Sequence, residues 1–358
     1  MILFLHNRYR ISGGEERSVR DLLWLVREQL GEPASLLERG EASRTEAALG
    51  MLRGGVDPAQ VERAVRSTGA RVLHAHNLNP TLGWRSLAAA REAGARVVLH
   101  LHQYRLVCAV GVCFTQGEEC TRCHGRSTLP GVLRNCRGSR AEALVYAAGL
   151  SAWQSQLLAQ VDELVVPSEF ARTRLVELGI ERASTAHVLP NIVREFAVGS
   201  RAAAGSYALL VCRLAPEKGI EAAIEACRIA GLELVVAGDG PMPRLAGARY
   251  VGALDAAALA ELRAGASLAL VPSRSAETFG LAAAEAMAAG LPVAGSRIGA
   301  LGELLPDEWL APPGDARALA AVAGRLAGDP AAGERALALA RERVAPEVAA
   351  SALRAIYA

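Results

Sequence analysis

The chain contains a single lysine, Lys218, although lysine and arginine together number 39 among its 358 residues. Lys218 lies five positions after Arg213, between an apolar segment at 207–211 and a helical pattern that begins near Glu221. A lysine ammonium is a compact charge on a flexible stem, which suits a phosphate oxygen. We therefore interpret Arg213 and Lys218 as a clamp for a diphosphate, with a solvated surface lysine as the alternative.

Two carboxylates lie eight positions apart in a second strand–loop–helix segment. Glu277 falls in the predicted loop, and Glu285 falls inside a predicted helix of small and apolar residues. A carboxylate on so apolar a helix is costly unless it is paired, and sugar or ribose hydroxyls are suitable partners. The amides of Gly280 and Leu281 would begin this helix, where backbone N–H groups bind phosphate. A solvated helix glutamate is the alternative reading of Glu285.

Two glycine turns follow other predicted strands and would allow a ligand to approach the backbone closely. The first turn, at 12–17, contains Gly14, and the second contains Gly238 and Gly240. The helix that follows the first turn would also offer free N–H groups to an anion. The first turn does not match the G-x-G-x-x-G pattern of dinucleotide sites, and plain turns without a ligand fit both segments equally well.

Short apolar segments alternate with longer amphipathic ones along the chain, which is the pattern of parallel, doubly wound α/β sheets. A hydrophobic content of 51% predicts a full core, and a net charge of +2 gives no support to nucleic-acid binding. Asp255 is a predicted N-cap of a helix at 256–264, and a helix is also expected at 15–30. The predicted strands are 1–6, 33–37, 71–74, 96–101, 162–166, 186–189, 207–211, 232–237, 249–251, 268–271 and 292–294.

The alternation of strands and helices restarts once, after a stretch of small residues near position 200, which predicts two domains. No apolar run approaches the ~20 residues of a membrane span, and the N-terminus lacks a basic leader, so we expect a cytoplasmic protein. The predicted organisation is a first Rossmann-like domain at 1–190, a linker at 191–205, a second Rossmann-like domain at 206–344 and a C-terminal helix at 345–358.

Together these motifs resemble the donor domain of retaining glycosyltransferases of family four. The resemblance implies the GT-B fold, in which two Rossmann-like, doubly wound parallel-sheet domains face a central cleft. It also implies that the C-terminal helix crosses back to the first domain. The residues that carry it are Arg213 with Lys218, Gly238-Asp239-Gly240-Pro241, Tyr250-Val251-Gly252, the segment 272–293, Gly13-Gly14-Glu15, His74-Ala75-His76-Asn77, Pro167-Ser168-Glu169-Phe170 and Pro190-Asn191.

The resemblance also implies roles for single residues. Arg213 and Lys218 would neutralise the donor diphosphate, and Glu277 would contact the donor sugar. Glu285 would hold the ribose hydroxyls. His102 would face the transferred sugar, but His100 points the same way in a strand and remains an alternative. Further contacts with the nucleotide-sugar are implied for Gly14, Gly238, Gly240, Gly252, Leu254, Phe279, Gly280 and Leu281.

The implied reaction moves a sugar from a nucleotide-diphosphate-sugar to an acceptor with retention of configuration. No catalytic metal or other cofactor is expected, because the clamp and the helix N-termini would stabilise the departing diphosphate. The acceptor stays open between a glycan, a lipid-linked sugar and a small molecule. Alternatives on the same fold are a sugar-nucleotide epimerase, a glycogen-type phosphorylase and a degenerate transferase that only binds nucleotide-sugar. The intact clamp and the paired glutamates favour the transferase.

Five of the seven cysteines lie between positions 108 and 136, in a loop at 103–137 that resembles a cysteine-rich loop in a subset of the family. Their spacing would suit a structural zinc ion held by Cys108, Cys120, Cys123 and Cys136. Reduced thiols and a disulfide or redox pair are the alternatives. The arginines of this region could form a basic rim for an anionic acceptor or a membrane surface, or could simply be solvated. They are Arg105, Arg122, Arg126, Arg134, Arg137 and Arg140.

Overall fold

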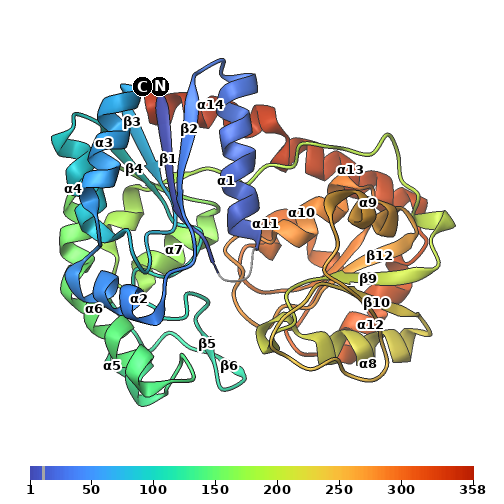
Figure 1. Cartoon of the computed structure of the whole chain (residues 1–358). Helices are drawn as coiled ribbons and strands as arrows, with labels where there is room; N and C mark the ends of the chain where they lie inside the picture. The colour runs from blue at the N-terminus through green and yellow to red at the C-terminus, as the bar shows by residue number, and fades with distance from the viewer. Residues whose placement is uncertain (10–12) are drawn as a thin grey trace. The chain divides into compact units, whose positions relative to one another are not determined.

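The computed structural model describes residues 1–9 and 13–358, and the contacts within it divide the chain into two compact units (Figure 1). Ser12, which begins the first predicted glycine turn, lies outside the described residues. Each unit is built around a six-stranded sheet. The first unit comprises Met1–Thr115, Cys120–Pro190 and Ala349–Ala358, and the second comprises Gln116–Glu119 and Asn191–Val348.

The sheet of the first unit has the strand order β2-β1-β3-β4-β7-β8, and its strands pair in parallel. The chain order therefore reverses between β1 and β3, as it does in doubly wound sheets of the flavodoxin type. Ligands of such sheets bind beyond the carboxyl ends of the strands at this reversal. The strands are β1 (Ile2–Asn7), β2 (Ala34–Arg39), β3 (Val72–Ala75), β4 (Arg96–His100), β7 (Glu163–Val166) and β8 (His187–Val188).

One face of this sheet is apolar and forms a hydrophobic core with the helices that cover it. Leu3, Leu73 and Leu99 alternate with residues of the opposite face and are almost completely buried in this core. Helices α3, α4 and α7 contribute the apolar side chains that pack against them. The helices of the unit are α1 (Gly14–Trp24), α2 (Arg44–Arg53), α3 (Pro58–Thr68), α4 (Gly83–Glu92), α5 (Leu129–Leu133), α6 (Arg140–Ala159), α7 (Glu169–Glu177) and α14 (Pro346–Tyr357).

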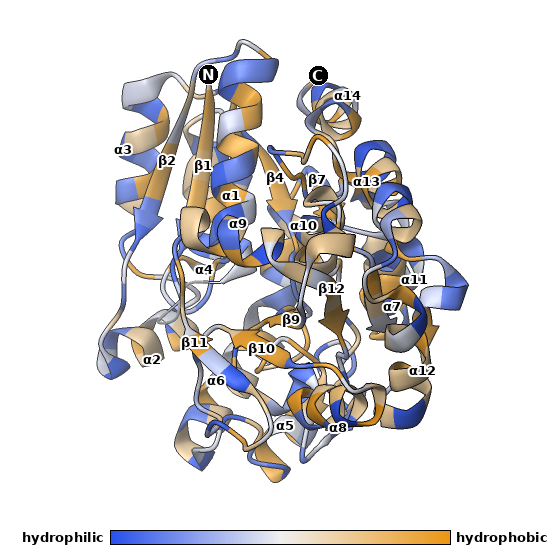
Figure 2. Ribbon diagram, turned by 90° about the vertical axis from the view of Figure 1, so that its right-hand side faces the viewer, coloured by the Kyte–Doolittle hydropathy of each residue, from blue (hydrophilic) through white to orange (hydrophobic). Residues whose placement is uncertain are grey.

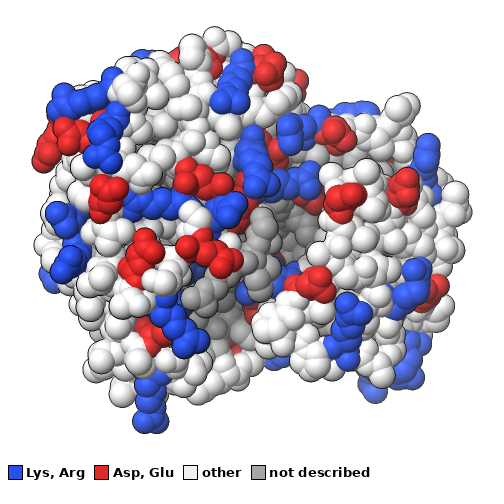
Figure 3. Space-filling model, viewed as in Figure 1, with Lys and Arg blue, Asp and Glu red and all other residues white. Residues whose placement is uncertain are grey.

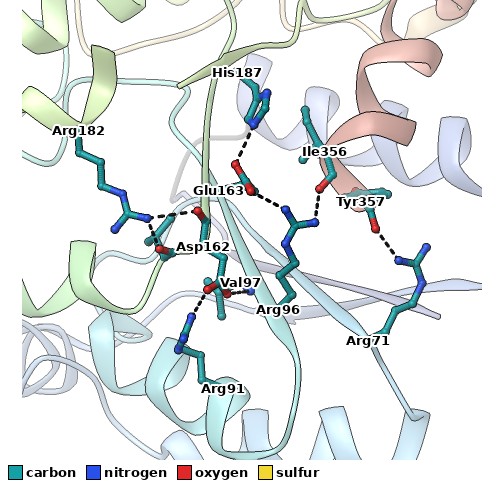
Figure 4. A network of polar contacts seen from close by, with 11 residues as sticks. Arg71, Arg91, Arg96, Val97, Asp162, Glu163, Arg182, His187, Ile356 and Tyr357 are labelled. Carbon is teal, nitrogen blue, oxygen red and sulfur yellow. Dashed lines mark hydrogen bonds and ion pairs between the residues drawn. The ribbon is translucent and has the colours of Figure 1, made fainter. Parts of the chain in front are cut away.

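The C-terminal helix α14 is bound to the sheet of the first unit by polar contacts (Figure 4). Arg71 and Arg96 donate hydrogen bonds of 2.6 and 2.8 Å to the carbonyl oxygens of Tyr357 and Ile356. These carbonyls end the helix and have no intrahelical donor, so cationic side chains suit them. Arg96 also contacts Glu163 at 2.5 Å. The last residues of the chain are therefore an integral part of the first unit.

The sheet of the second unit has the strand order β11-β10-β9-β12-β13-β14, again with parallel pairing. Counted within the unit, this order is the 3-2-1-4-5-6 arrangement of dinucleotide-binding sheets, and the reversal lies between β9 and β12. The strands are β9 (Tyr207–Val211), β10 (Leu234–Ala237), β11 (Arg249–Gly252), β12 (Ala266–Val271), β13 (Val293–Ser296) and β14 (Leu310–Ala311).

The helices of the second unit pack apolar faces on this sheet and leave hydrophilic residues outside, as the colouring of α13 in Figure 2 shows. Asp255 caps α9, because its Oδ1 accepts a hydrogen bond of 2.9 Å from the Ala258 amide, as predicted. The helices are α8 (Ile220–Ala230), α9 (Ala256–Ala264), α10 (Leu281–Ala288), α11 (Leu301–Leu304), α12 (Ala316–Leu326) and α13 (Pro330–Val344).

Eleven strands were predicted and all are confirmed, each with ends within two residues of the prediction. The predicted helix at 15–30 is wrong in its length, because α1 ends at Trp24 and a wider π-helical turn continues from Leu25 to Gln29. Strand β14 was missed because two residues are too short for a periodic pattern to emerge. The short strands β5 (Phe114–Thr115) and β6 (Glu118–Glu119) were missed for the same reason. Among the described residues, no helix has both the length and the apolar character to cross a membrane.

Candidate functional site

Lys218 and Glu277 meet at the strand-order reversal of the second unit. Lys218 follows β9 in a short 3-10 turn, and Glu277 lies in the loop between β12 and α10. The Lys218 Nζ lies 2.7 Å from the Glu277 Oε1, and the Ser273 hydroxyl donates to the same oxygen at 2.7 Å. The structure therefore brings together two residues predicted 59 positions apart, at the place where doubly wound sheets bind their ligands.

Both members of this ion pair are charged at neutral pH. Although burial opposes ionisation, the Lys218 ammonium and the Ser273 hydroxyl hold the pKa of Glu277 below its usual value. Burial likewise opposes the charge on Lys218, but the Glu277 carboxylate raises the pKa of the ammonium. Arg213 is about half exposed and forms an ion pair with Glu217, four positions later. Each cation of the predicted clamp thus forms an ion pair with a carboxylate of the same unit.

The glycine turn after β10 packs directly against the segment that carries Arg213. The Leu214 amide donates to the Asp239 carbonyl at 3.0 Å, and the Gly238 amide donates to the Gly252 carbonyl at 2.7 Å. Gly238 has a φ of 132°, and a Cβ there would lie 1.9 Å from a backbone oxygen, so only glycine allows this approach. The loops after β9, β10 and β11 therefore form one cluster that contains Gly238, Gly240 and Gly252 beside the clamp.

The remaining residues predicted for the donor in this unit lie at two helix starts. Gly280 is the N-cap of α10 with a φ of 97°, and Leu281 is the first residue of the helix. The Phe279 side chain is buried in the core, so this residue can offer a ligand only its backbone. Leu254 lies at the start of α9 with its side chain exposed. The α10 N-terminus thus faces the same loop that holds Glu277.

Glu285 has a protein partner that sequence reasoning missed. Its side chain is 8% exposed and forms an ion pair with Arg263, whose side chain is 10% exposed. The prediction that this carboxylate must be paired is consistent with its burial, but the partner seen here is an arginine of α9 rather than a hydroxyl. Arg263 lies 22 positions earlier, on another helix, so no local pattern linked the two residues.

In the first unit, histidines occupy the face of the sheet opposite the hydrophobic core. His74, His76, His100 and His102 stack on one another, with ring centroids between 4.1 and 5.5 Å apart. The His76 Nδ1 lies 2.8 Å from the His102 Nε2, and the His74 Nδ1 lies 2.6 Å from the Tyr357 hydroxyl. His100 is 1% exposed and His102, just beyond the end of β4, is 8% exposed. The more open position belongs to the histidine that the family resemblance favoured.

Burial keeps these histidines neutral, which predicts a stability that falls with acid. Burial lowers the pKa of His74 and His102 to about 3, and it lowers the pKa of His76 and His100 well below 6.5. Between about pH 6.5 and 3 the unfolded chain therefore binds more protons than the folded one, so stability falls as pH falls. Each such histidine contributes up to about 1.4 kcal/mol per pH unit.

The test is the melting temperature measured from pH 7.5 to pH 5. We expect a steady fall below pH 6.5 that becomes shallower in a His74→Phe variant, whereas His124→Gln, at an exposed histidine, keeps the wild-type slope. The carboxyls of Glu15 and Glu16 lie near this cluster, and the His6 ring lies 6.4 Å from that of His76. An unchanged melting temperature across this range would contradict the assignment of the neutral cluster.

Helix α1 begins at Gly14, which is exposed, and Glu15 and Glu16 follow it in the first turn. Glu16 closes the helix start, because its carboxylate accepts hydrogen bonds from the Tyr9 and Gly13 amides at 2.9 and 2.8 Å. Glu15 instead accepts from the Tyr9 hydroxyl at 2.7 Å and from the Gln103 amide at 3.2 Å. Burial raises the pKa of Glu15. The roles of Tyr9 and Gln103 were not predicted, since neither residue belongs to a motif.

The predicted zinc ligands are close in sequence but do not converge in this structure. Cys108 pairs with Cys113, a residue outside the predicted set, and the hydrogen bond from the Cys113 thiol lowers the pKa of Cys108 to about 6. Cys136 contacts Thr115. Within the described residues, no three cysteine sulfurs lie within 4.8 Å of one another. Structural zinc on Cys108, Cys120, Cys123 and Cys136 stays a prediction; about one zinc per chain in metal analysis would support it, and none would contradict it.

The one set of three metal-binding side chains found in the described residues is histidine, not cysteine. Candidate ligand atoms of His74, His76 and His100 lie within 4.8 Å of one another. All three side chains are buried. The rings are also nearly parallel, with His74 and His100 inclined by 14°. The arrangement is therefore a packed stack rather than a convergent ligand set.

Comparison with known proteins places these features in a family. The model of the family described as "Glycosyl transferase 4-like domain" matches residues 12–192, and that of "Glycosyl transferases group 1" matches residues 205–329. The first match alone covers half of the chain. Among solved structures, Anabaena HepE in complex with UDP-glucose is similar over 99% of both chains, with a TM-score of 0.64 and 16% identity. The two Rossmann-like domains are those of the GT-B fold, and the chain belongs to the glycosyl transferase 4-like family.

Curated relatives match this chain only in part. A glycogen synthase of Mycobacterium tuberculosis is 37% identical over 155 residues, which cover 38% of this chain and 37% of that protein. An exopolysaccharide phosphotransferase of Streptomyces coelicolor is 33% identical over 189 residues, which cover 48% of this chain and 20% of that protein. The chain thus spans about a third or less of the length of these two relatives. They support the family membership and leave the reaction to be proposed.

Proposed function

We propose that this protein is a retaining glycosyltransferase that moves a hexosyl group from a nucleoside diphosphate-sugar to a hydroxyl acceptor. The observation that carries the proposal is the Lys218–Glu277 pair, 2.7 Å apart at the strand-order reversal of the second unit. A cation, a carboxylate and the N-terminus of α10 meet there, and these groups suit a phosphate bonded to a sugar. The complex of HepE with UDP-glucose shows that a protein of this fold binds such a donor.

In the proposed reaction, the acceptor oxygen bonds to the anomeric carbon on the face that the diphosphate leaves. The bond from that carbon to the phosphate oxygen breaks, and the departing diphosphate takes the acceptor proton. Arg213 and Lys218 would stabilise the negative charge that develops on the diphosphate, so the proposal includes no catalytic metal. Glu277 would turn from Lys218 to the sugar hydroxyls. His102 keeps the role that the family resemblance implies, a contact with the transferred sugar.

A panel of nucleotide-sugars, assayed with a chelator present, tests the proposal. We expect one donor at about 100 times its Kd to stabilise the protein by roughly 2.7 kcal/mol and to be hydrolysed slowly without acceptor. UDP-, GDP- and ADP-sugars separate the candidate bases, and NMR of the glycoside product reports the anomeric configuration. No stabilisation and no hydrolysis with any donor would contradict the proposal, and an inverted product would contradict retention.

We further propose that the protein works at the cytoplasmic face of a membrane. Helices α2, α5 and α6 would bind it peripherally to the lipid. Half of the exposed large hydrophobic residues described in the chain lie on these mutually packed helices. Between positions 120 and 142 the chain carries five arginines against one acidic residue, which suits anionic lipid. The surface over α5 is largely uncharged in Figure 3, with basic side chains projecting from it. The exposed leucines of these three helices are Leu49, Leu52, Leu129, Leu133 and Leu144.

Replacing Leu129 and Leu133 together by serine is expected to weaken binding to vesicles at least about tenfold, because each buried leucine contributes 1.5 kcal/mol or more. Cosedimentation with vesicles of phosphatidylglycerol and phosphatidylcholine measures the effect. Val176→Ser is the matched control, since Val176 is exposed on α7, away from these helices. Equal binding of the double variant and the wild type would contradict the membrane contact, as would no vesicle binding by either protein.

A further inference from the structure

The first unit contains a pocket that begins at His102 and extends between its helices to residues with no role in the proposed donor chemistry. It contains about 690 Å³ of space between atoms, a figure that includes the solvent at its open mouth. Its walls come from β4, α1, α2, α4 and α6 and from the loops that follow β3 and β4. All of its lining residues belong to the first unit. The pocket is therefore a property of that unit.

One end of the pocket is polar and contains the groups already described. His76, His100 and His102 line it, together with Glu15 and Gln103. The His76 Nε2 and both ring nitrogens of His100 are buried without a hydrogen-bond partner among the described residues. Orphaned buried polar atoms are rare in folded proteins and are often satisfied by a ligand or water. This end is therefore suited to hydroxyl groups.

The other end of the pocket is formed by two tryptophans and by aliphatic side chains. Trp84 of α4 and Trp153 of α6 have ring centroids 6.0 Å apart, at an angle of 40°. Met51, Leu150 and Leu157 complete this end. Such a wall of ring faces and hydrocarbon binds apolar groups well.

The polar atoms at the apolar end are already engaged within the protein. The Trp153 Nε1 donates to the carbonyls of Met51 and Leu52, at 3.1 Å each. The Gln154 Nε2 donates to the carbonyls of Leu106 and Gly125, at 2.7 and 2.9 Å. A sugar ring placed there would find few partners for its hydroxyls, which would be costly to bury.

The remaining donor at this end, the indole nitrogen of Trp84, faces the protein rather than the pocket. A Cβ on Gly54 would lie 2.1 Å from this nitrogen, so the indole edge packs on the glycine backbone. Gly54 has a φ of 70°, which a larger residue adopts only with strain. Gly54 thus leaves room for the edge of the Trp84 indole, and the ring lines the pocket.

We infer that this pocket binds an acceptor that joins a hydroxyl-bearing head to an apolar aglycone, with the aglycone lying against Trp84 and Trp153. The inference rests on the proposed function, because it names the acceptor class for that reaction. The head would lie at the polar end, beside His102, Glu15 and Gln103, and the hydrocarbon would lie against the tryptophan end. The apolar group is either aromatic, as in a free small molecule, or isoprenoid, as in a lipid carrier.

Three glucosides with the same head and different aglycones test the inference by calorimetry without any donor. They are methyl, 4-methylumbelliferyl and geranyl β-D-glucoside. We expect at least one of the two apolar glucosides to bind the full chain about tenfold or more tighter than the methyl glucoside. Tighter binding of the aromatic probe identifies a small-molecule aglycone, and tighter binding of the geranyl probe identifies a lipid carrier. Equal binding of all three overturns the inference.

Two pocket variants and a control on the same helix locate the binding. Trp153→Ala is expected to remove most of the advantage of the apolar probes, and Leu157→Ala part of it, which keeps the test valid if the first variant fails to fold. Gln156→Ala, at an exposed residue of α6 outside the pocket lining, keeps the wild-type affinities. Unchanged affinities in both folded pocket variants would overturn the inference.

Donor binding is measured on the wild type in a separate titration with the nucleotide-sugar panel. Apolar-probe binding without donor binding would contradict the proposed function and leave the pocket assignment standing. Donor binding without any preference for apolar probes would contradict only the pocket assignment. The two failures are therefore distinguishable.

Discussion

Lys218→Met is expected to lower kcat/KM for the nucleotide-sugar by about 100- to 1000-fold. The only lysine of the chain lies at the strand-order reversal of the second unit, where a diphosphate would develop negative charge. Removing one group that stabilises such charge in the transition state costs about this factor. Nucleotide-sugar affinity should fall as well, because the ground-state diphosphate is already charged. Steady-state kinetics and calorimetry on the same preparation measure both effects.

The same substitution should lower stability by about 1 to 3 kcal/mol, because Glu277 would keep only the Ser273 hydroxyl among the contacts described above. Lys218 and Glu277 are 25% and 19% exposed, so solvent moderates this cost. The folded protein holds the pKa of Glu277 below 4.5, the usual value for a glutamate. The ion pair therefore contributes its full stability above pH 4.5, and this contribution is lost as the pH falls toward the lowered pKa of the folded state. Thermal unfolding at pH 7 and pH 4 should show the difference between variant and wild type shrinking in acid.

Three further variants separate a phosphate role from a structural one. Lys218→Arg keeps the charge but presents a planar fork, so we expect it to recover stability more fully than activity. The double variant Lys218→Met/Glu277→Gln removes both charges and should regain stability while staying inactive. Arg228→Ala, at an exposed cation on α8, should change neither property. Full activity in Lys218→Met would contradict the clamp assignment.

The positions of the motifs could be predicted from the sequence because each one follows a strand. The alternation of short apolar segments with amphipathic ones shows where each strand ends. A parallel sheet then brings the carboxyl ends of its strands to one edge. Lys218 and Glu277 were therefore each placed in a loop at that edge. Their direct contact was not predicted, since it depends on β9 and β12 being neighbours, which the chain order does not reveal.

The contacts that were missed all join elements through side-chain packing. Arg263 reaches Glu285 from another helix, and Cys113 hydrogen-bonds Cys108 from a position outside the predicted set. Trp84 and Trp153 come from helices α4 and α6, and neither lies in a motif of the family. Periodicity reports which face of a helix is buried, but not which neighbouring helix meets it. A tryptophan or arginine on a helix indicates a contact or a pocket only once it is known which helices are neighbours.

Glu285→Ala is expected to destabilise the protein by about 3 kcal/mol, because Arg263 would lose its carboxylate while remaining 10% exposed. For the unfolding of the second unit as one cooperative transition, the melting temperature should fall by roughly 6 to 12 °C. Nucleotide affinity should also fall if Glu285 holds the ribose hydroxyls, as the family resemblance implies. A single variant cannot separate these two effects, since a loosened α10 would disturb the N-terminus that lies beside Glu277.

The double variant Glu285→Ala/Arg263→Met separates them. With both charges removed, an apolar pair of similar volume should restore most of the stability, because buried ion pairs are often replaceable by hydrocarbon. The ribose contact would still be missing, so affinity for the nucleotide alone should stay at least about tenfold below wild type. Glu285→Gln keeps a hydrogen-bond acceptor, so its nucleotide affinity should lie between those of the wild type and the double variant. Full recovery of nucleotide affinity in the double variant would show that Glu285 only holds Arg263, and that the ribose is bound elsewhere.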